Sequence, residues 1–455
     1  MPQARIAMLV SFLGAVLTSP LAAQNPSPKT TDLSDAEKLY GLSLIWQEAN
    51  YNFAFFDQVP DLDWDSAYRA FVPRVLATGN SYEYYQELKR FVALLEDGHT
   101  SVYLPDPDRR FESYPWILTE NVEGRVLVAN VGRTLEKEIP VGSLIEEIDG
   151  EPAAERTLRV WLPYVFSSTD HHRRDLTLAR ALHGPPAQPV TIAYVTPNGE
   201  RRERTLARDR GTRDDEWLLP TRSTRPRFAF RWLDDGIAYV ALNTFNDEGV
   251  VTDFEAALPE LYRAKALVVD VRRNGGGSSG NGYAIAAFLT DDTLRTSAWR
   301  TREHVASFKA WGRWSDRYKN YFNMEAWRDG GTHGDVPPAE GRRLIVPTVV
   351  LQEHATFSAA EDFLVAIDAI PHITTLGRPS GGSTGQPLLL QLPGGGGANI
   401  CTKRDAYPDG REFVGYGIAP DIVVESTIED VQADRDPQLE RALELLREEL
   451  SSSKD

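Results

Sequence analysis

The chain has 455 residues, 42% of them hydrophobic, and a formal net charge of −17 at pH 7. This length and apolar content suffice for roughly two to four domains with hydrophobic cores. The excess of acidic residues argues against binding to nucleic acid or to an anionic membrane surface, because like charges repel. Cys401 is the only cysteine, so no disulfide can form within the chain.

The first residues have the pattern of an export signal. Arg5 precedes an apolar run over residues 6–17, and the small residues Ala22 and Ala23 follow before a polar stretch. The run is shorter than the roughly 20 residues that a membrane-spanning helix needs. We therefore predict a cleavable signal peptide at 1–23 and a periplasmic or secreted protein without a membrane span.

A helical region is predicted next, over residues 24–112. Ser34 and Glu37 have the spacing of a capping box, which marks the start of a helix. Three helices are expected, from Asp35 to about residue 55, over 64–76 and over 81–97. Apolar residues recur at helical spacing in the third, and Gly98 is expected to end it, so that His99 follows directly.

Short strands replace helices after residue 113. Strands are expected over residues 125–131, 143–150 and 190–200. The last of these contains Asn198-Gly199, a dipeptide typical of a hairpin turn. We predict a compact strand-rich module at 113–208, followed by a linker at 209–227 that is rich in Arg and Thr.

The remaining chain alternates buried-type strands with helices. Strands are expected over 236–242, 266–272 and 348–352, and helices over 251–262, 280–289 and 358–369. This order predicts an α/β domain at 228–432 with mainly parallel strands, and a C-terminal helix within 433–455. An aromatic-rich insertion between Trp299 and Trp327 is interpreted as a helix docked over the core; a substrate-gripping surface is the alternative.

Ser358 is a candidate nucleophile because it lies where a strand gives way to a helix. A hydroxyl at such a turn is exposed, and the amide of Ala359 at the helix N-terminus could stabilise an oxyanion. Serine is also a common helix N-cap. The residue alone is therefore a weak signal.

A second turn, in VVDVRRNGGGSSG at 268–280, places three glycines after a buried strand. Glycines allow a tight turn and a close backbone approach. A phosphate-binding loop is the alternative, but the GK[ST] ending is missing. We expect the amide of Gly276, or of a neighbour, to complete an oxyanion hole with Ala359.

A serine nucleophile needs a base, and the chain contains eight histidines. His99 follows a rigid helix and is flanked by turn residues, so its ring can project. His354 lies only four residues before Ser358 on the same strand. His171 and His172 fall in an Arg-rich loop and could suggest a metal, but no further ligand supports one; we expect them to be solvated.

Five motifs occur together in one order. They are EDGHTSVYL (96–104), PVGSLIEEIDG (140–150), ALVVDVRRNGGG (266–277), VVLQEHATFSAAEDF (349–363) and VGYGIAPDIVVE (414–425). This set resembles the tail-specific, or C-terminal processing, serine peptidases, and within them the tricorn-like branch. The resemblance implies an α/β fold with a catalytic domain of the crotonase and Clp-protease kind, an N-terminal helical unit and a PDZ-like module at 113–208.

The resemblance also implies roles for individual residues. Ser358 becomes the nucleophile and His99 the base, with the amides of Ala359 and Gly276 as the oxyanion hole. One branch of the family uses a lysine about 25 residues after the serine. The corresponding segment here, GRPSGGSTG, has Ser383 near that place and no lysine, which favours the Ser-His branch.

The group that orients the histidine is less well defined. The Ser-His branch often has Ser just before the histidine, where this chain has Gly98, and takes an acidic group from near the C-terminal motif. Glu412 is the candidate acid, with Asp421 and Glu425 as alternatives. Glu361, one helical turn after the serine, either stabilises the site or caps its helix.

The sequence thus predicts a peptidase that needs no metal or cofactor. Its substrate is a protein or peptide, whose C-terminus the PDZ-like module could bind; no nucleic acid is involved, and an oligomer is left open. The alternative is a non-catalytic protein on the same scaffold that binds peptides or hydrophobic ligands, as in the retinoid-binding relatives. The joint presence of serine, histidine and both turns favours the peptidase, while Gly98 keeps the alternative open.

Overall fold

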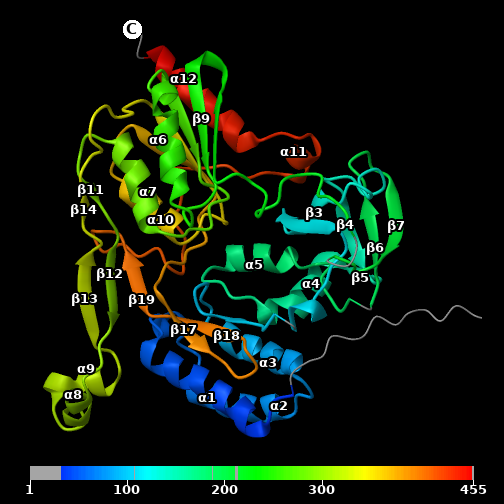
Figure 1. Cartoon of the computed structure of the whole chain (residues 1–455), viewed down its shortest axis with the longest axis vertical. Helices are drawn as coiled ribbons and strands as arrows, with labels where there is room; N and C mark the ends of the chain where they lie inside the picture. The colour runs from blue at the N-terminus through cyan, green and yellow to red at the C-terminus, as the bar shows by residue number, and fades with distance from the viewer. Residues whose placement is uncertain (1–31, 107, 187, 211–213, 453–455) are drawn as a thin grey trace, which may run out of the picture.

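Three groups of elements surround the centre of the molecule: N-terminal helices, a strand-rich module and a larger α/β part (Figure 1). The computed structural model describes residues 32–106, 108–186, 188–210 and 214–452. The predicted signal peptide at 1–23 lies outside the described residues. Among the described residues, no helix combines the length and apolar character needed to cross a membrane.

The N-terminal helices follow the prediction closely. They are α1 (Asp35–Asn52), α2 (Trp64–Leu76) and α3 (Ser81–Ala93). Ser34 and Glu37 form the expected capping box. The third helix ends four residues earlier than predicted, and Glu96 then adopts a positive φ of 48°, so a turn separates the helix from His99.

A short strand joins this region to the α/β part. Strand β1 (Ser101–Tyr103) pairs antiparallel with β18 (Gly397–Cys401), which pairs with β17 (Pro387–Gln391). The N-terminal region is therefore not a purely helical unit. Its last strand is part of a sheet whose other strands lie almost 300 residues further along the chain.

The module at 113–208 is built on an antiparallel sheet in the order β2-β3-β4-β6-β7, with β5 paired to β4. Its elements are β2 (Ile117–Val122), β3 (Arg125–Val131), β4 (Leu144–Ile148), β5 (Glu151–Pro152), α4 (Ala153–Trp161), α5 (Asp170–Leu178), β6 (Val190–Val195) and β7 (Arg201–Leu206). The module has a core of its own. Helix α5 runs from it toward the centre of the molecule (Figure 1).

The predicted linker at 209–227 is structured where it is described. The Leu218 amide donates to the Val131 carbonyl, and the Trp217 and Trp116 ring centroids are 4.9 Å apart. Its first part therefore packs on the module. Its second part turns at Thr221 and leads into the edge strand of the α/β sheet.

The α/β part contains a six-stranded sheet in the order β20-β16-β15-β10-β9-β8, parallel except for the edge pair β8 and β9. The strands are β8 (Phe228–Trp232), β9 (Ile237–Leu242), β10 (Ala266–Asp270), β15 (Thr348–Gln352), β16 (Ile373–Gly377) and β20 (Ile422–Val423). Side chains alternate between two cores. Helices α6 (Gly249–Leu261), α7 (Ser279–Ala286) and α10 (Ala359–Ile367) contribute to one of them, and α12 (Pro437–Ser452) to the other.

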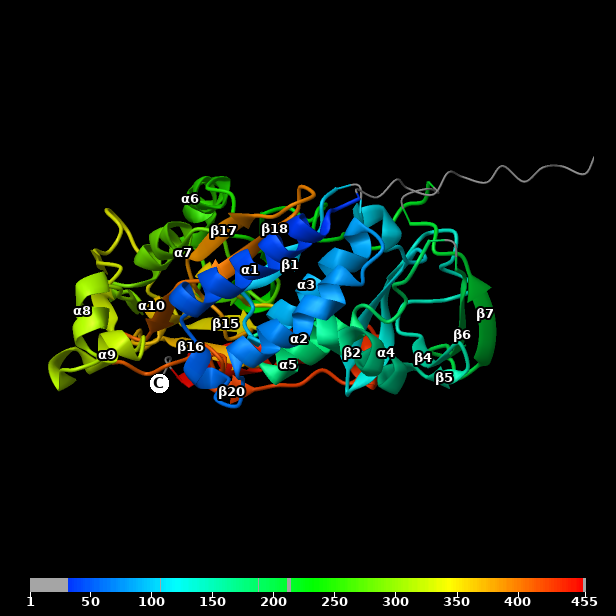
Figure 2. The same cartoon turned by 90° about the horizontal axis from the view of Figure 1, so that it is seen from below.

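The aromatic insertion differs from its prediction. It forms a hairpin of β12 (Ala298–Arg302) and β13 (Trp327–Thr332), extended by β19 (Lys403–Ala406), with α8 (Ala306–Trp311) and α9 (Lys319–Phe322) at its tip. The tip projects away from the core (Figures 1 and 2). Its rings pack on one another, as Phe308 does on Tyr318 at 4.7 Å, and Trp314 is 80% exposed. The predicted helix docked over the core is therefore wrong.

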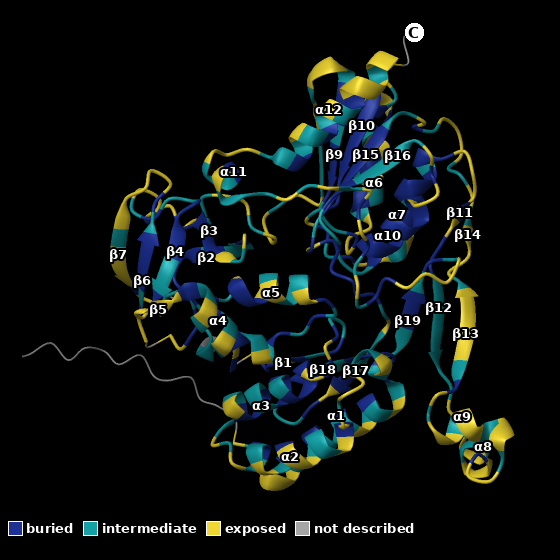
Figure 3. Ribbon diagram, turned by 180° about the vertical axis from the view of Figure 1, so that it is seen from behind, coloured by how far each residue is buried: buried dark blue, intermediate teal, exposed yellow. Residues whose placement is uncertain are grey.

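The C-terminal elements connect the α/β part back to the module. Helix α11 (Ile428–Gln432) places Ile428 and Val431 against buried residues of the module sheet. The final helix, predicted within 433–455, extends over Pro437–Ser452. A short antiparallel pair of β11 (Leu294–Arg295) and β14 (Asp335–Val336) completes the described strands. Figure 3 shows the buried strands of the α/β sheet and the more exposed outer faces of the helices.

Candidate active site

Ser358 lies at the turn between β15 and α10, as predicted. Its backbone has φ 58° and ψ −127°, a conformation that non-glycine residues rarely adopt and that surrounding contacts must maintain. Those contacts are present, because the Ser358 amide faces the Ser383 carbonyl at 3.1 Å and a Glu361 carboxylate oxygen at 3.0 Å. The turn fixes the backbone and leaves the hydroxyl free to contact a base.

Glu361 supports the turn from below, where its side chain is fully buried. It accepts hydrogen bonds from the Ser380 hydroxyl and from the amides of Gly382, Ser383 and Ser358, at 2.5–3.0 Å. Burial raises the pKa of Glu361 to about 8, even though these donors lower it. The carboxyl group of Glu361 therefore joins the nucleophile turn to the loop at 380–383, which combines both roles considered for it.

His99 is the histidine that the structure brings to Ser358. Its Nε2 lies 3.1 Å from Ser358 Oγ, and its ring stacks on Phe357 with centroids 4.9 Å apart and planes 7° from parallel. Strand β1 begins two residues later and pairs with β18. The stack and the strand pairing together fix the ring against the nucleophile.

The second nitrogen of His99 contacts Ser383. The Nδ1 to Oγ distance is 2.7 Å, and Ser383 Oγ lies 3.5 Å from Asp97 Oδ1. Asp97 is almost fully buried and also accepts from Ser168 Oγ at 3.0 Å. A serine and a carboxylate therefore lie behind the histidine, in the arrangement that orients a catalytic imidazole.

Gly98 has a packing reason in this arrangement. A Cβ at this position would lie 2.8 Å from Phe357 Cζ and 3.1 Å from Ser383 Oγ. A side chain there would therefore displace both the ring that stacks on His99 and the hydroxyl that contacts it. Ser383, which lies far along the chain, therefore supplies the hydroxyl next to the imidazole.

Glu412 does not contact His99, contrary to the prediction. Its carboxylate accepts from Arg404 at 2.8 and 3.1 Å and from Arg300 at 3.3 Å. The two guanidiniums are its electrostatic partners, because both strands that carry them run beside the Glu412 loop.

The two alternatives to Glu412 lie elsewhere as well. Asp421 accepts from the amide and hydroxyl of Thr375, and Glu425 faces Arg378 at 3.8 Å. The acid near the histidine is instead Asp97. It lies within the EDGH segment itself, and only its side-chain direction was missing from the sequence.

The two predicted oxyanion donors differ in availability. Ala359 is the first residue of α10, so its amide has no partner within the helix. Gly276, with φ +90°, lies so close to the nucleophile that a Cβ there would be 2.6 Å from Ser358 Cβ. Its amide, however, donates to Asn274 Oδ1 at 3.0 Å. The structure thus brings both residues to Ser358 but leaves only the Ala359 amide unoccupied.

The charge state of His99 follows from its surroundings. Burial lowers the pKa of His99, and the negative charges of Asp97 and Asp405 raise it in part. The net effect keeps the imidazole neutral to lower pH than usual. A neutral ring is the form that can accept a proton from Ser358.

Helix α5 of the module reaches the same site, which the sequence did not indicate. His171 Nε2 lies 2.7 Å from the Ser380 carbonyl, and the ring of His172 lies 5.4 Å from that of Phe357. Burial lowers the pKa of His172 to about 4. The interpretation of both histidines as solvated loop residues is therefore wrong, because α5 packs against the catalytic loops.

The other histidine considered as a base is also engaged. His354 Nδ1 lies 2.6 Å from the Asp175 carboxylate of α5, so it joins the module to the α/β part. Within the described ranges, no group of three or more His, Cys, Asp or Glu side chains could hold a metal ion. Among the described residues, the site is a chain of contacts from Ser358 through His99 and Ser383 to Asp97.

Comparison with known proteins confirms the α/β class and the family resemblance. Residues 236–424 match the model of Peptidase family S41; this range includes Ser358 and Ser383 but not His99. No curated protein sequence matches significantly. Two solved structures illustrate the fold.

The first of these structures is mature CPAF complexed with lactacystin. It has a TM-score of 0.68 at 16% identity, covering 90% of this chain and 97% of that chain. The second, a candidate peptidase from Parabacteroides merdae ATCC 43184, has a TM-score of 0.53 at 19% identity, with 91% and 97% covered. The similarity extends over nearly the whole length of each chain, so the fold is shared beyond the matched peptidase domain.

Proposed function

We propose that this chain is an exported serine peptidase, which hydrolyses peptide bonds of proteins or peptides through an acyl-enzyme on Ser358. Its residues 236–424 match the model of Peptidase family S41. The observation that carries the proposal is the 3.1 Å contact between Ser358 Oγ and the buried Nε2 of His99. It joins a hydroxyl on a strained strand-to-helix turn to a base that is neutral at physiological pH.

The chemistry follows from the positions of these atoms. His99 Nε2 takes the proton of Ser358 as Oγ attacks the substrate carbonyl carbon, and the Ala359 amide donates to the oxyanion. The Gly276 amide becomes the second donor when it leaves Asn274 Oδ1 and donates to the oxyanion instead. When the tetrahedral intermediate collapses, the C–N bond breaks and His99 returns the proton to the leaving amine. Water then hydrolyses the ester by the same route.

Ser383 and Asp97 support the base during this cycle. With Nε2 as the acceptor, Nδ1 carries the hydrogen and donates to Ser383 Oγ, whose own hydrogen points to Asp97. When His99 becomes protonated, the buried carboxylate stabilises the positive ring through this hydroxyl. Ser383 and Asp97 are therefore positioning residues.

The remaining proposals concern location and substrate delivery. The export pattern at 1–23 supports a periplasmic or secreted enzyme. The contacts of α5 with the loop at 380–383 support a PDZ-like role for the module, in which an extended peptide end binds beside its sheet and is held near the nucleophile. We propose an endopeptidase that also cleaves close to C-termini.

Labelling with a fluorophosphonate probe tests the nucleophile. Wild type and the control Ser315→Ala, a serine in the hairpin tip, are expected to label equally, whereas Ser358→Ala is expected to show no labelling. Circular dichroism checks that all three proteins are folded. Absence of labelling in the folded wild type, or labelling that survives in Ser358→Ala, would refute the proposed acyl-enzyme.

A further inference from the structure

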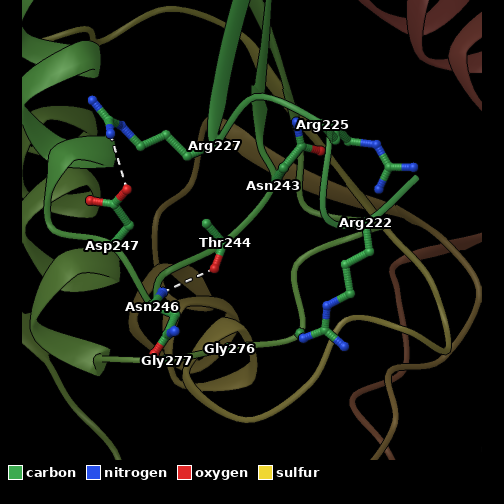
Figure 4. A pocket seen from close by; sticks show the side chains of 10 residues that line it. Arg222, Arg225, Arg227, Asn243, Thr244, Asn246, Asp247, Gly276 and Gly277 are labelled. Carbon is green, nitrogen blue, oxygen red and sulfur yellow. Dashed lines mark hydrogen bonds and ion pairs between the residues drawn. The ribbon is translucent and has the colours of Figure 1, made fainter. Parts of the chain in front are cut away.

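A cavity of about 600 Å³ lies at the glycine turn (Figure 4). Its floor is the glycine turn at 275–277, whose middle residue, Gly276, lies against Ser358 and the Ala359 amide. Its walls come from the end of β9 and from the segment that precedes β8. The cavity residues are Arg222, Arg225, Arg227, Asn243, Thr244, Asn246, Asp247 and Gly275–Gly277.

Three arginines face this cavity, and they differ in their partners. Arg227 is paired with Asp247 at 3.0 Å and with Asp253 at 2.7 Å. Arg222 and Arg225 have no ion pair with any described carboxylate. Arg222 reaches the glycine turn, since a Cβ on Gly275 would lie 2.8 Å from its Nη2, while Arg225 extends along the outer rim (Figure 4).

The charges of Arg222 and Arg225 are not neutralised by a contacting carboxylate among the described residues. Burial and the charge of the neighbouring Arg273 lower the pKa of Arg225, and the more distant charge of Asp270 raises it in part. Arg273 likewise forms no ion pair among the described residues. A guanidinium group without an ion-pair partner can bind a carboxylate through two parallel hydrogen bonds.

The segment that carries the arginines is held in place. The Arg225 amide donates to the Thr221 carbonyl at 2.9 Å, which closes a turn. Asn243 anchors the end of the segment, because its amide donates to the Arg227 carbonyl and its side chain to the Pro226 carbonyl, both at 2.9 Å. This part of the predicted linker therefore forms an ordered wall of the cavity.

We propose that Arg222, assisted by Arg225, forms a substrate subsite that binds a carboxylate close to the scissile bond. The proposal rests on the proposed peptidase function and adds the substrate class, namely peptides with an acidic group near the cleavage point. The carboxylate can belong to an Asp or Glu side chain or to the C-terminus of the substrate. The Arg222 guanidinium lies against Gly275, and the next residue, Gly276, lies against Ser358. Either source of the carboxylate would therefore lie within a few residues of the bond that is cut.

The test uses fluorescence-quenched octapeptides derived from a sequence that wild type cleaves, with Glu replacing Gln at each position in turn. At one position or more, wild type is expected to show kcat/KM at least about tenfold higher for Glu than for Gln, the gain of one charge-assisted hydrogen bond. Arg222→Gln should reduce this ratio toward one, and Arg225→Gln should reduce it less. Arg222→Glu should shift the preference to Lys. Added salt should weaken the wild-type ratio.

A matched control is Arg328→Gln, which removes an exposed arginine of β13 with no ion pair among the described residues. It changes the net charge equally and is expected to keep the wild-type ratio. Arg328→Gln should also label with the fluorophosphonate probe at the wild-type rate, because it lies outside the proposed site. Loss of labelling in wild type would instead refute the peptidase itself, so the two failures are distinguishable.

A second peptide series distinguishes the two sources of the carboxylate, by comparing free with amidated C-termini at increasing distances from the cleaved bond. A preference for the free acid that Arg222→Gln removes assigns the subsite to the substrate C-terminus; a preference only for internal Glu assigns it to side chains. The proposal is wrong if wild type prefers neither internal Glu over Gln nor a free over an amidated C-terminus. It is also wrong if one of these preferences persists in the Arg222→Gln/Arg225→Gln double variant.

Discussion

Ser358 and His99 lie 3.1 Å apart, yet the chain positions them by different means. Ser358 is placed by a local strand, turn and helix, together with a glutamate one helical turn away. His99 lies 259 residues earlier in the sequence and is placed by an aromatic stack and by the pairing of β1 with β18. The nucleophile is therefore defined by its own segment, whereas the base depends on tertiary structure.

Removal of the imidazole should have the largest effect. His99→Ala is expected to lower kcat at least about 10⁴-fold, because the serine loses its base while the fold stays intact. Steady-state hydrolysis of a fluorogenic peptide measures the loss. His304→Ala, an exposed histidine of the hairpin, serves as the control; residual activity within tenfold of wild type in His99→Ala would mean that another group is the base.

The carboxylate behind the base should have a smaller effect with a distinct signature. Asp97→Asn is expected to lower kcat about 100-fold and to move the acid limb of the pH profile to lower pH, because Asp97 raises the pKa of His99. Ser168→Ala keeps the carboxylate and should keep the limb in place. An unchanged limb in Asp97→Asn would show that this carboxylate does not act on His99.

The pH dependence of wild-type activity tests whether the base is a buried histidine. Activity requires neutral His99, and the folded-state pKa of this ring is lowered from 6.5 mainly by burial. Activity is therefore expected to be lost at a lower pH than for an unperturbed histidine, whose pKa is about 6.5. The profile of kcat/KM measures this limb. A plateau reached only near pH 9 would contradict a histidine base.

Glu412 should have the smallest effect on catalysis. Glu412→Gln weakens its pairing with Arg404 and Arg300 but leaves the surroundings of His99 unchanged. We expect kcat within about twofold of wild type and a loss in the free energy of unfolding of about 1 kcal/mol, as for partly exposed ion pairs. Urea unfolding and peptide hydrolysis measure the two quantities. A large fall in kcat with normal stability would restore Glu412 as the orienting acid.

The sequence was informative wherever a feature depends on neighbouring residues. The turn at Ser358, the capping box at Ser34 and the glycine turn all result from short-range geometry, and the structure has each of them near its predicted place. The parallel strands were also predictable, because buried strands have continuous apolar runs. Local preference and tertiary structure agree in these segments.

Features that depend on distant segments were missed or misplaced. Ser383 appeared only as a residue near the place of an absent lysine, and its contact with His99 arises from the loop that Glu361 anchors. Asp97 was visible in the sequence, but no pattern shows that a side chain two residues before a histidine turns back beneath it. The hairpin tip resembled a docked helix because its aromatic residues pack on one another, a contact that composition cannot separate from core packing.

The pairing of β1 with β18 also bears on when the enzyme becomes active. While the chain is still unfolded, its base and its nucleophile are apart, because they are separated by 259 residues. Peptide hydrolysis therefore requires the pairing of β18 with β1, so a molecule in which these two strands are separate is not expected to cleave its neighbours. Peptidase activity could therefore be used to measure the fraction of molecules in which β1 and β18 have paired.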